Sequence, residues 1–406
     1  MTNLPQGWEV KKLGEIGEIV TGSTPSKSNL DFYGKDYPFF KPSDFEQGYF
    51  LENAGDNLSK LGFDKARQLP PKTILVVCIG SLGKVALTRV IGSCNQQINA
   101  IIPHKNIIAE YIYYYCISSK FQSILFSKAP QTTLAILNKT EFSKLEIIYP
   151  KDIKEQERIV GILDESFAKI DESIKILEQD LLNLDELMQS ALQKAFNPLK
   201  DNAKENYKLP QGWEWKSLGE IANTSSGGTP SRNKKEYWEN GNIKWLKSGE
   251  LNDGYIDFIE ENITEEAIKN SSAKIFQKGT LLIAMYGATA GKLGILNLDS
   301  TTNQAICAFL HKDKNIKFLE KFLFYFLFFL RDKIIKDSFG GAQPNINQTY
   351  IKNLQIPLPP IKEQEQIASH LDELSSHVKN LKQNYQAQIK DLQELKNSLL
   401  DKAFKG

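Results

Sequence analysis

The sequence predicts a mixed α/β protein in which two similar globular α/β domains are joined by two long helices that pair as an antiparallel coiled coil. Three observations predict this architecture. Motifs recur in the same order in two halves of the chain, short apolar runs typical of buried strands fill most of each half, and each half ends in a heptad pattern. With 406 residues, 41% of them hydrophobic, the chain is long enough for more than one core.

The internal repeat has a period of about 205 residues, which is far too long for a solenoid and indicates two copies of a domain with an appendage. The matched blocks are LPQGWE (4–9 and 209–214), LGEI (13–16 and 218–221), GSTPSK and GGTPSR (22–27 and 227–232), GK (83–84 and 291–292), NQ (95–96 and 303–304), KEQE (154–157 and 362–365) and KAF (194–196 and 402–404). Other segments, such as 46–68 and 252–275, differ. Two similar frames with different variable segments suggest two similar tasks on two different targets.

The repeat divides the chain into four segments. We expect globular domains at 1–153 and 201–361, where short apolar runs such as TILVV (73–77) and TLLIA (280–284) are typical of buried strands. The remaining segments, 154–200 and 362–406, are expected to be the long helices. Prolines stop the first helix and precede the second, at Pro198 and Pro359-Pro360.

Apolar residues alternate at spacings of four and three along both helical segments, which is the seam of a coiled coil. The first seam comprises Leu163, Phe167, Ile170, Ile174, Leu177, Leu181, Leu184, Met188, Ala191 and Ala195. The second seam comprises Leu371, Leu374, Val378, Leu381, Tyr385, Leu392, Leu395 and Leu399, with Gln388 as a polar interruption. A helix of ~43 residues is roughly 65 Å long, and antiparallel pairing would put one globular domain at each end.

The composition is typical of a cytoplasmic protein but does not by itself indicate a binding partner. The net charge of +1 does not favour nucleic acid by itself, so DNA binding must rest on local features. The chain start lacks the pattern of a secretory signal, and the longest apolar run, 322–330, is about half of a ~20-residue membrane span. The cysteines form no CxxC pair and are expected to be reduced core residues, not a disulfide frame or zinc site; they are Cys78, Cys94, Cys116 and Cys307.

Taken together, the duplicated motifs resemble the specificity subunits of type I restriction–modification systems over nearly the whole chain. The resemblance is carried by the LPxGW opening, the GxTPS loop, the Gly-Lys and Asn-Gln pairs, the LPPIKEQ start of the second long helix (358–364) and the KAF endings. Each motif is weak alone, but the duplicated set in one order is specific. The first copy departs from the pattern, because YPKDI (149–153) stands where the second copy has PLPPI (357–361).

The resemblance implies a non-catalytic, DNA-binding subunit of a restriction–modification complex. In that family, each globular domain is a target-recognition domain that reads one half of a split double-stranded DNA target, and the helices set the spacer and dock two methyltransferase subunits. S-adenosylmethionine, ATP and Mg are implied only for the methyltransferase and motor/endonuclease subunits, so we expect no cofactor, metal or membrane contact for this chain. Two domains can engage one face of DNA when half-site centres lie about 34–36 Å apart.

The candidate DNA-contacting residues lie in the GxTPS loops, beside aromatic residues and in the Gly-Lys turns. Small residues and hydroxyls in the loops favour close approach of phosphate; the alternative is a capped turn that opens the domain. Lysines beside aromatic residues can stack or pair with phosphate or stay solvated, and Gly-Lys turns can present amides and an ammonium or be purely structural. The candidates are Thr24, Ser26, Lys27, Lys41, Lys84, Thr229, Ser231, Arg232, Lys247 and Lys292.

Direct base reading is expected elsewhere. The Asn-Gln pairs at 95–96 and 303–304 have side chains that can read adenine bidentately. Their occurrence in both halves, before apolar strands, favours a shared structural role instead. We therefore expect the base-reading side chains in segments that differ between the halves, such as 46–68 and 252–275.

The sequence contains no recognisable catalytic motif. GATAGKL (287–293) and GSLGKV (80–85) lack the spacing and hydroxyl of a P-loop, and no Asp/Asn-Pro-Pro-aromatic motif of an amino-methyltransferase occurs. His370 and His377 lie two turns apart on one helix without a third metal ligand. The alternative to a DNA-reading subunit is a non-catalytic protein scaffold built on the coiled coil.

Overall fold

The computed structural model describes residues 4–129, 135–196, 209–312, 317–337 and 345–404. The chain forms two compact units, which we call unit 1 (Met1–Glu178 with Tyr385–Gly406) and unit 2 (Gln179–Asn384). Each unit contains one sheet-rich domain and a part of both long helices.

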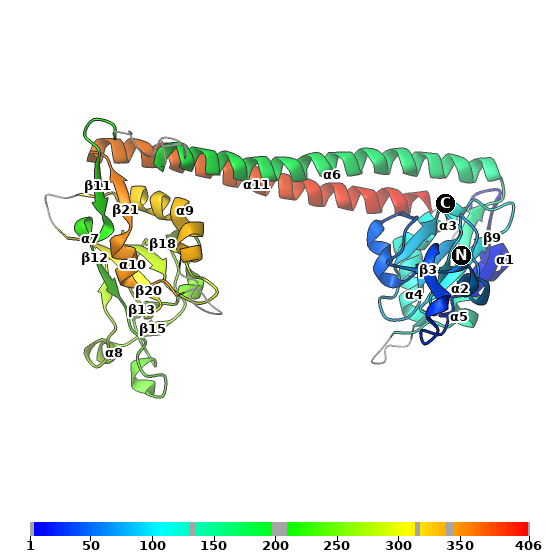
Figure 1. The fold of residues 1–406 in the computed structure, drawn as a ribbon, viewed down its shortest axis with the longest axis horizontal. Coiled ribbons are helices and arrows are strands. Elements are labelled where there is room, and N and C mark those ends of the chain that lie inside the picture. Colours follow the sequence, from blue (N-terminus) through cyan, green and yellow to red (C-terminus); the bar gives the residue numbers. More distant parts are fainter. Residues whose placement is uncertain (1–3, 130–134, 197–208, 313–316, 338–344, 405–406) are drawn as a thin grey trace. The chain divides into compact units, whose positions relative to one another are not determined.

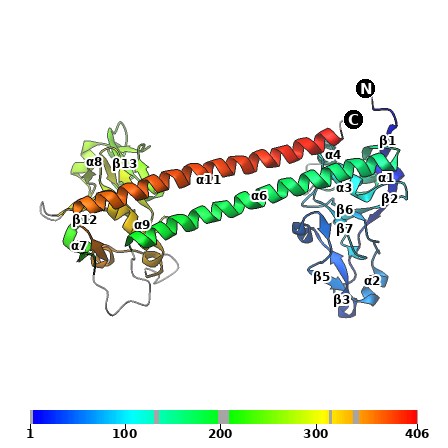
Figure 2. The same cartoon turned by 90° about the horizontal axis from the view of Figure 1, so that it is seen from above.

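Unit 1 contains a five-stranded sheet in the order β2-β9-β6-β7-β4, a three-stranded sheet β5-β3-β8 and the pair β1-β10. The strands are β1 (Trp8–Lys12), β2 (Gly17–Thr21), β3 (Tyr33–Phe40), β4 (Phe50–Leu51), β5 (Asp56–Leu58), β6 (Ile74–Val77), β7 (Val85–Thr88), β8 (Ser93–Cys94), β9 (Ile98–Pro103) and β10 (Glu146–Pro150). The shorter helices are α1 (Leu13–Ile16), α2 (Lys60–Lys65), α3 (Ala109–Ile117), α4 (Ser119–Lys128) and α5 (Lys139–Ser143). Helix α3 packs against β6 and β7 (Figure 2).

Unit 2 contains a five-stranded sheet β12-β20-β17-β18-β14, a four-stranded sheet β15-β13-β19-β16 and the pair β11-β21. The strands are β11 (Glu214–Ser217), β12 (Ala222–Ser226), β13 (Ile243–Leu246), β14 (Gly254–Ile256), β15 (Asn262–Ile263), β16 (Ile275–Phe276), β17 (Leu281–Ala284), β18 (Leu293–Leu296), β19 (Ser300–Thr302), β20 (Ile306–His311) and β21 (Gln355–Leu358). The shorter helices are α7 (Leu218–Ile221), α8 (Glu265–Lys269), α9 (Glu320–Asp337) and α10 (Gln348–Asn353). Helix α9 packs against β17 and β18, and Figure 1 shows α9 beside β18.

The five-stranded sheets of the two units share one topology, which confirms the mixed α/β class and the duplication. In both five-stranded sheets the last pair is parallel, β4 with β7 and β14 with β18, and the other pairs are antiparallel. The central strands β6 and β17 are buried throughout. Because side chains alternate across a strand, Ile74 and Val76 enter one core of unit 1, and Leu75 and Val77 enter another.

The long helices are α6 (Ile153–Phe196) and α11 (Ile361–Ala403). Each begins with a buried glutamine from the KEQE motif, Gln156 or Gln364, at 0% and 1% exposure. The carbonyl oxygen of Gln364 accepts from the Leu319 amide at 2.8 Å, and its amide nitrogen donates to the carbonyls of Lys317 and Pro359 at 3.3 and 2.9 Å. Gln156 makes the same three kinds of bond in unit 1. The motif therefore ties the first turn of each long helix to its domain.

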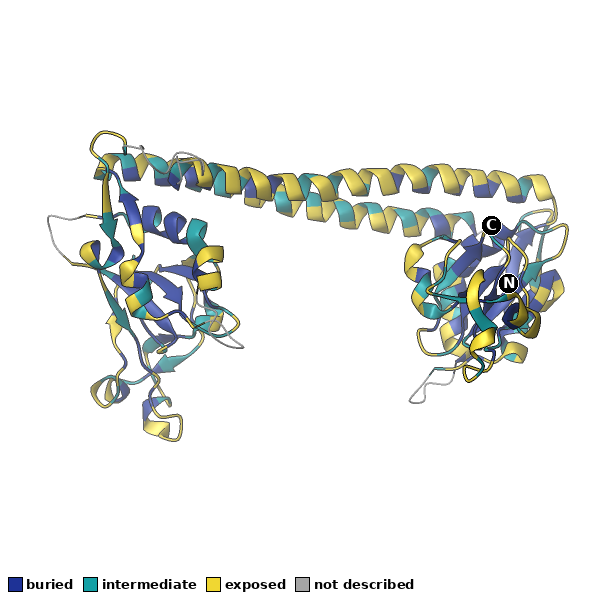
Figure 3. Cartoon of the chain, in the orientation of Figure 1, coloured by how far each residue is buried: buried dark blue, intermediate teal, exposed yellow. Residues whose placement is uncertain are grey.

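Within each unit the long helices run antiparallel. In unit 1, Lys396 of α11 pairs with Asp171 of α6 at 2.6 Å, and later α11 residues lie beside earlier α6 residues. In unit 2, Lys382 of α11 pairs in the same way with Asp185 of α6. Figure 3 shows that both helices carry buried and half-buried positions along one side and are exposed over most of the rest.

The KAF endings close the cores. Phe404 is 1% exposed in unit 1, with its ring edge-on to Tyr111 and Tyr115 at centroid distances of 5.3 and 5.2 Å. Phe196 is buried in unit 2 against Phe322 and Phe326. Each unit thus receives the start of one long helix and the end of the other, and both parts belong to its core.

The seam of α11 differs from the predicted one at three positions. Leu381 and Leu395 are 40% and 47% exposed and Gln388 is exposed too, and the seam passes instead through Lys382, Ile389 and Lys396. The lysine stems pack along the seam while their ammonium groups pair with aspartates of α6. The other seam candidates are buried or half-buried: Leu163, Ile170, Ile174, Leu177, Leu181, Leu184, Leu371, Leu374, Val378, Leu392 and Leu399.

Cysteines and histidines form no reactive or metal-binding group in the described part of the chain. All four cysteines are buried and unpaired, and burial raises the pKa of Cys78 and Cys94 to about 12. No cluster of three or more His, Cys, Asp or Glu side chains suited to a metal occurs among the described residues. No described helix is long and apolar enough to cross a membrane.

Candidate nucleic-acid interface

In both units the GxTPS loop lies against the turn that carries the Asn-Gln pair. In unit 1, the amides of Gly22 and Ser23 donate to the carbonyls of Ile98 and Cys94 at 3.0 and 2.9 Å. A Cβ on Gly22 would lie 2.1 Å from the carbonyl oxygen of Asn95. Only glycine permits this approach, which explains the first residue of the motif.

The same contact recurs in unit 2. The amide of Gly228 donates to the carbonyl of Thr302 at 2.9 Å, and a Cβ on Gly227 would lie 2.0 Å from that oxygen. The indole of Trp245 also donates to the carbonyl of Gly228 at 2.9 Å. Loop and turn are therefore a single rigid feature, which we call the loop–turn pair (22–27 with 95–97 in unit 1, 227–232 with 303–304 in unit 2).

Each loop–turn pair is joined by one side-chain hydrogen bond. Thr24 donates to Oε1 of Gln96, and Thr229 donates to Oε1 of Gln304, both at 2.5 Å. Both glutamines are exposed. Of the loop candidates, Thr24 and Thr229 thus position a neighbouring polar group.

The asparagines of the Asn-Gln pairs are structural. Asn95 is 8% exposed, accepts from the Gln97 amide at 3.1 Å and donates to the Gln97 side chain at 2.8 Å. In unit 2, Oδ1 of Asn303 is buried with no hydrogen-bond partner among the described residues. Because Asn95 is buried and Asn303 is half-buried, their placement favours a structural role over base reading.

Lys41 and Lys247 occupy equivalent places and are both neutralised. The Lys41 ammonium pairs with Asp56, and the Lys247 ammonium pairs with Glu261 at 2.7 Å. Their backbone amides also donate to a carboxylate three residues on, at 2.7 and 2.8 Å. Each lysine therefore ties a strand to its antiparallel neighbour, which favours a structural role over phosphate pairing.

In unit 2, Arg232 pairs with the same carboxylate as Lys247. Its guanidinium pairs with Glu261 at 2.6 Å and stacks on Trp238 and Trp245, 3.7 and 4.7 Å from the ring centroids. Burial pushes the pKa of Glu261 up, but the hydrogen bonds from Arg232 and Lys247 outweigh it, so this pKa lies below its usual value of 4.5. Glu261 is thus a carboxylate shared by two cations.

Each Gly-Lys turn lies at the end of a hairpin and accepts a hydrogen bond from a side chain of a nearby helix. Gly83 and Gly291 have φ of +90° and +81°, and their amides donate back into the hairpin to Val77 and Ala284 at 2.9 and 2.8 Å. Their carbonyls accept from Gln122 of α4 at 3.0 Å and from Arg331 of α9 at 2.9 Å, respectively. The glycine amides are thus already used, which favours the structural interpretation of these turns.

The remaining candidates are exposed side chains. Lys84 pairs with Glu46 at 2.5 Å, whereas Lys27 and Lys292 have no ion pair among the described residues. Ser26 bonds the neighbouring Ser28 at 2.7 Å, and the carbonyl of Ser231 accepts from Trp238 at 3.1 Å. Lys27 is the candidate cation that lies on a loop–turn pair and keeps its charge available.

Two basic residues beside the loop–turn pairs escaped the sequence analysis. The Arg67 guanidinium donates to the Thr21 carbonyl at 3.1 Å, and its backbone amide donates to Ser23 at 3.2 Å. In unit 2, the Lys274 ammonium donates to the Ser225 hydroxyl at 3.3 Å. Arg67 and Lys274 lie 207 residues apart, close to the repeat offset, and that offset within otherwise divergent segments is the signal that could have revealed them.

Comparisons with known proteins agree with this duplicated architecture. The family model described as "Type I restriction modification DNA specificity domain" matches residues 5–181 and 210–391. Most of the chain is therefore covered by two copies of that domain. The chain belongs to the family of type I restriction–modification specificity subunits, which are non-catalytic and whose cofactors belong to the other subunits of the complex.

Individual relatives differ in how much of the chain they match. The specificity subunit of the type I restriction enzyme HindI from Haemophilus influenzae is 38% identical over 186 residues, covering 44% of this chain and 40% of that protein. The MjaIX specificity subunit from Methanocaldococcus jannaschii is 26% identical over 417 aligned positions, covering 99% of this chain and 94% of that protein.

Solved structures support the fold. A chain from a study of assembly and conformational transition of the type I system has a TM-score of 0.80 at 21% identity, covering 100% of this chain and 99% of that chain. The HsdS subunit from Thermoanaerobacter tengcongensis has a TM-score of 0.63 at 22% identity, covering 100% and 98%.

Proposed function

We propose that the chain reads a split double-stranded DNA target, with 1–153 and 201–361 each acting as a target-recognition domain for one half. The single observation that carries this proposal is the duplication of a whole sheet topology around segments that differ. A common frame would place each domain on DNA in the same way, since contacts to phosphate position a protein without reading sequence. The segments that differ would then read different bases.

The variable segments have the exposure that base reading needs. Segment 46–68 contains β4, β5 and α2, and segment 252–275 contains β14, β15 and α8. The second segment exposes Phe258 at 77%, with the Lys244 ammonium 5.8 Å from its ring centroid. An exposed aromatic ring beside a cation suits contact with a thymine methyl group or an unstacked base.

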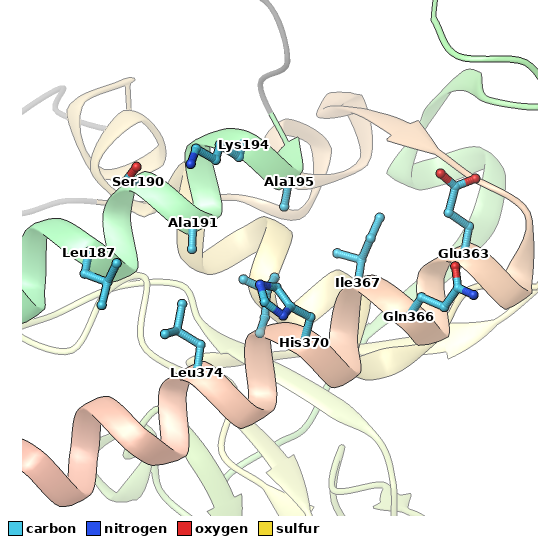
Figure 4. Close-up of a pocket in the computed structure, with 11 residues that line it drawn as sticks. Leu187, Ser190, Ala191, Lys194, Ala195, Glu363, Gln366, Ile367, His370 and Leu374 are labelled. Atoms are coloured by element: carbon cyan, nitrogen blue, oxygen red, sulfur yellow. The ribbon is translucent and has the colours of Figure 1, made fainter.

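We also propose that two methyltransferase subunits dock on the long helices, one in each unit. Unit 2 has a groove of about 610 Å³ between α6 and α11, where Leu187 and Ala191 lie opposite His370 and Leu374 (Figure 4). Unit 1 has a groove of about 460 Å³. The linings correspond at an offset of 208: Glu155, Ile159, Ile162, Leu163, Leu399, Lys402 and Ala403 against Glu363, Ile367, His370, Leu371, Ala191, Lys194 and Ala195.

Two equivalent grooves with apolar floors and a Lys and a Glu in each lining suit two copies of one helical partner. Ile162 and His370 are exposed groove positions, so Ile162→Asp and His370→Asp should each remove one methyltransferase copy. Native mass spectrometry of the complex with its cognate partner should show a fall from two copies to one. Two copies retained in both variants would contradict docking in these grooves.

In this proposal the motor/endonuclease subunits join the assembled methyltransferase, and the complex acts in the cytoplasm, where host DNA is methylated. The decisive experiment is single-molecule sequencing of methylated adenines in host DNA with and without the gene. Loss of a split motif on deletion supports the proposal and yields both half-sites and the spacer. If a host that also expresses the cognate methyltransferase shows no difference, the protein is a scaffold instead of a DNA reader.

A further inference from the structure

We propose that Gln96 and Gln304 each donate a side-chain N–H bond to a DNA backbone phosphate, so that each loop–turn pair is a sequence-independent phosphate site. This inference rests on the proposed DNA-reading function. It assigns a role to the exposed glutamine of each Asn-Gln pair, a pair for which the sequence favoured a structural role.

Each glutamine side chain still has a hydrogen-bond donor that is not in use. Its Oε1 atom already accepts the threonine hydroxyl at 2.5 Å, and its amide nitrogen has no acceptor among the described residues. The exposed group is therefore a donor, held in place by Thr24 or Thr229. Bidentate adenine reading needs the amide oxygen as well as the nitrogen, and the threonine hydroxyl already occupies one of the two lone pairs of that oxygen.

The bonded glutamine and threonine recur in both units, although the variable segments of the two units differ. The same glutamine, the same threonine and the same 2.5 Å bond occur in both. A side chain that discriminates bases is expected to differ where the two half-sites differ. Phosphate oxygens are acceptors at every nucleotide, so an unchanging donor fits them.

Positively charged side chains lie beside both loop–turn pairs. Arg67 in unit 1 and Lys274 in unit 2 both contact the strand that leads into the loop, and both are exposed. Neither has a carboxylate partner among the described residues, and the same is true of Lys27 on the unit 1 loop. Each site therefore combines a fixed neutral donor with at least one uncompensated cation, which suits an anion.

The test uses the complex of the full chain with its cognate methyltransferase subunits, and the probes are a cognate and an unrelated DNA duplex. Gln96→Leu and Gln304→Leu should each weaken binding to both duplexes by about 10-fold, leaving the affinity ratio and the methylated motif unchanged. Gln96→Lys should restore affinity and steepen the salt dependence by about 0.9 in log–log slope. Gln6→Leu and Gln211→Leu, which change two exposed glutamines that lie 205 residues apart in the two copies of the repeat, are the matched controls.

Two results would overturn the proposal. Unchanged affinity in both Leu variants would show that these amides do not touch DNA. A changed base preference at one position of a half-site would show base reading instead. Thermal unfolding of each variant separates lost binding from lost folding. Failure of the proposed function itself looks different, because the unaltered complex would then bind no split sequence in preference to unrelated DNA.

Discussion

The glutamine of the KEQE motif is the polar side chain that fixes the start of each long helix. Its three backbone hydrogen bonds explain why the sequence keeps a polar residue at a fully buried position, because an unpaired buried polar group is costly. The sequence revealed the motif through its duplication. It could not reveal the role, because the bonded amide and one of the two bonded carbonyls lie in a segment almost 50 residues away.

We predict that Gln364→Leu destabilises unit 2 by about 3 kcal/mol, because the amide of Leu319 and two backbone carbonyls lose the hydrogen bonds that the Gln364 side chain makes to them. Denaturant unfolding of the purified protein measures the loss. Gln366→Leu, two residues on and exposed, is the control and should change stability by less than about 0.5 kcal/mol. Equal effects of the two changes would contradict a tethering role.

The shared carboxylate of Glu261 predicts a pH-dependent contribution to stability. Its pKa in the folded protein lies below the usual value of 4.5, so its stabilisation is present above that value and is lost as pH falls through the folded-state pKa. Glu261→Gln should therefore lower the melting temperature at neutral pH, and the gap to the unaltered protein should close as the pH is lowered below about 4. Glu260→Gln, an exposed neighbour, should show no such closing gap.

The sequence identified the GxTPS loops and the Asn-Gln pairs, but neither their contact with each other nor the pairing of the nearby charges. Thr24 and Thr229 proved to be joined to the Asn-Gln turns, and Lys41, Lys247 and Arg232 proved to be paired with carboxylates. The acidic partners Asp56 and Glu261 lie 14 or more residues from the cations they neutralise. Such pairing depends on strand register, which composition and spacing do not report.

At the scale of elements, the seam of α11 shows where periodicity is ambiguous. Leu381 and Lys382 are neighbours, and a spacing of three or of four after Val378 places one or the other on the seam. The sequence favoured the leucine because it is apolar. The structure favours the lysine because its stem packs while its ammonium reaches Asp185, so an acidic residue on the partner helix decides the register.

We predict that Leu371→Ala and Leu381→Ala have very different effects although both remove the same side chain. Leu371 is 1% exposed and packs in the core of unit 2, so its truncation should cost about 2–5 kcal/mol. Leu381 is exposed, so its truncation should cost less than about 1 kcal/mol. Helix stability followed by circular dichroism during denaturation distinguishes the two. A larger loss for Leu381→Ala would restore the seam expected from the sequence.

At the scale of the whole molecule, the duplication, the fold class and the two long helices could all be predicted from the sequence. They rest on patterns that repeat over many residues, and no single position decides them. The division into compact units could not be predicted, because it depends on where the end of each helix packs. Phe196 and Phe404 were visible only as matching helix endings.

We predict that lengthening both long helices lengthens the spacer of the DNA target and leaves both half-sites unchanged. Insertion of one heptad into the middle of both α6 and α11 keeps the seam in phase and adds about 10 Å to each, which corresponds to roughly 3 base pairs of DNA. Sequencing of methylated adenines should show a longer spacer between two unchanged half-sites. As the control, exchange of segment 46–68 should alter one half-site and leave the spacer unchanged. An altered half-site after heptad insertion would contradict the spacer role.

The placement of Phe404 in the core of unit 1 has a consequence for synthesis. Unit 2 is one uninterrupted stretch of chain, Gln179–Asn384, whereas unit 1 needs Tyr385–Gly406 as well as Met1–Glu178. A ribosome that has made residue 384 has produced everything that unit 2 contains, but the aromatic pocket of Tyr111 and Tyr115 still lacks its ring. The part of the chain that emerges first is therefore the last to close, and until then it exposes an unfilled core to other nascent chains and to chaperones.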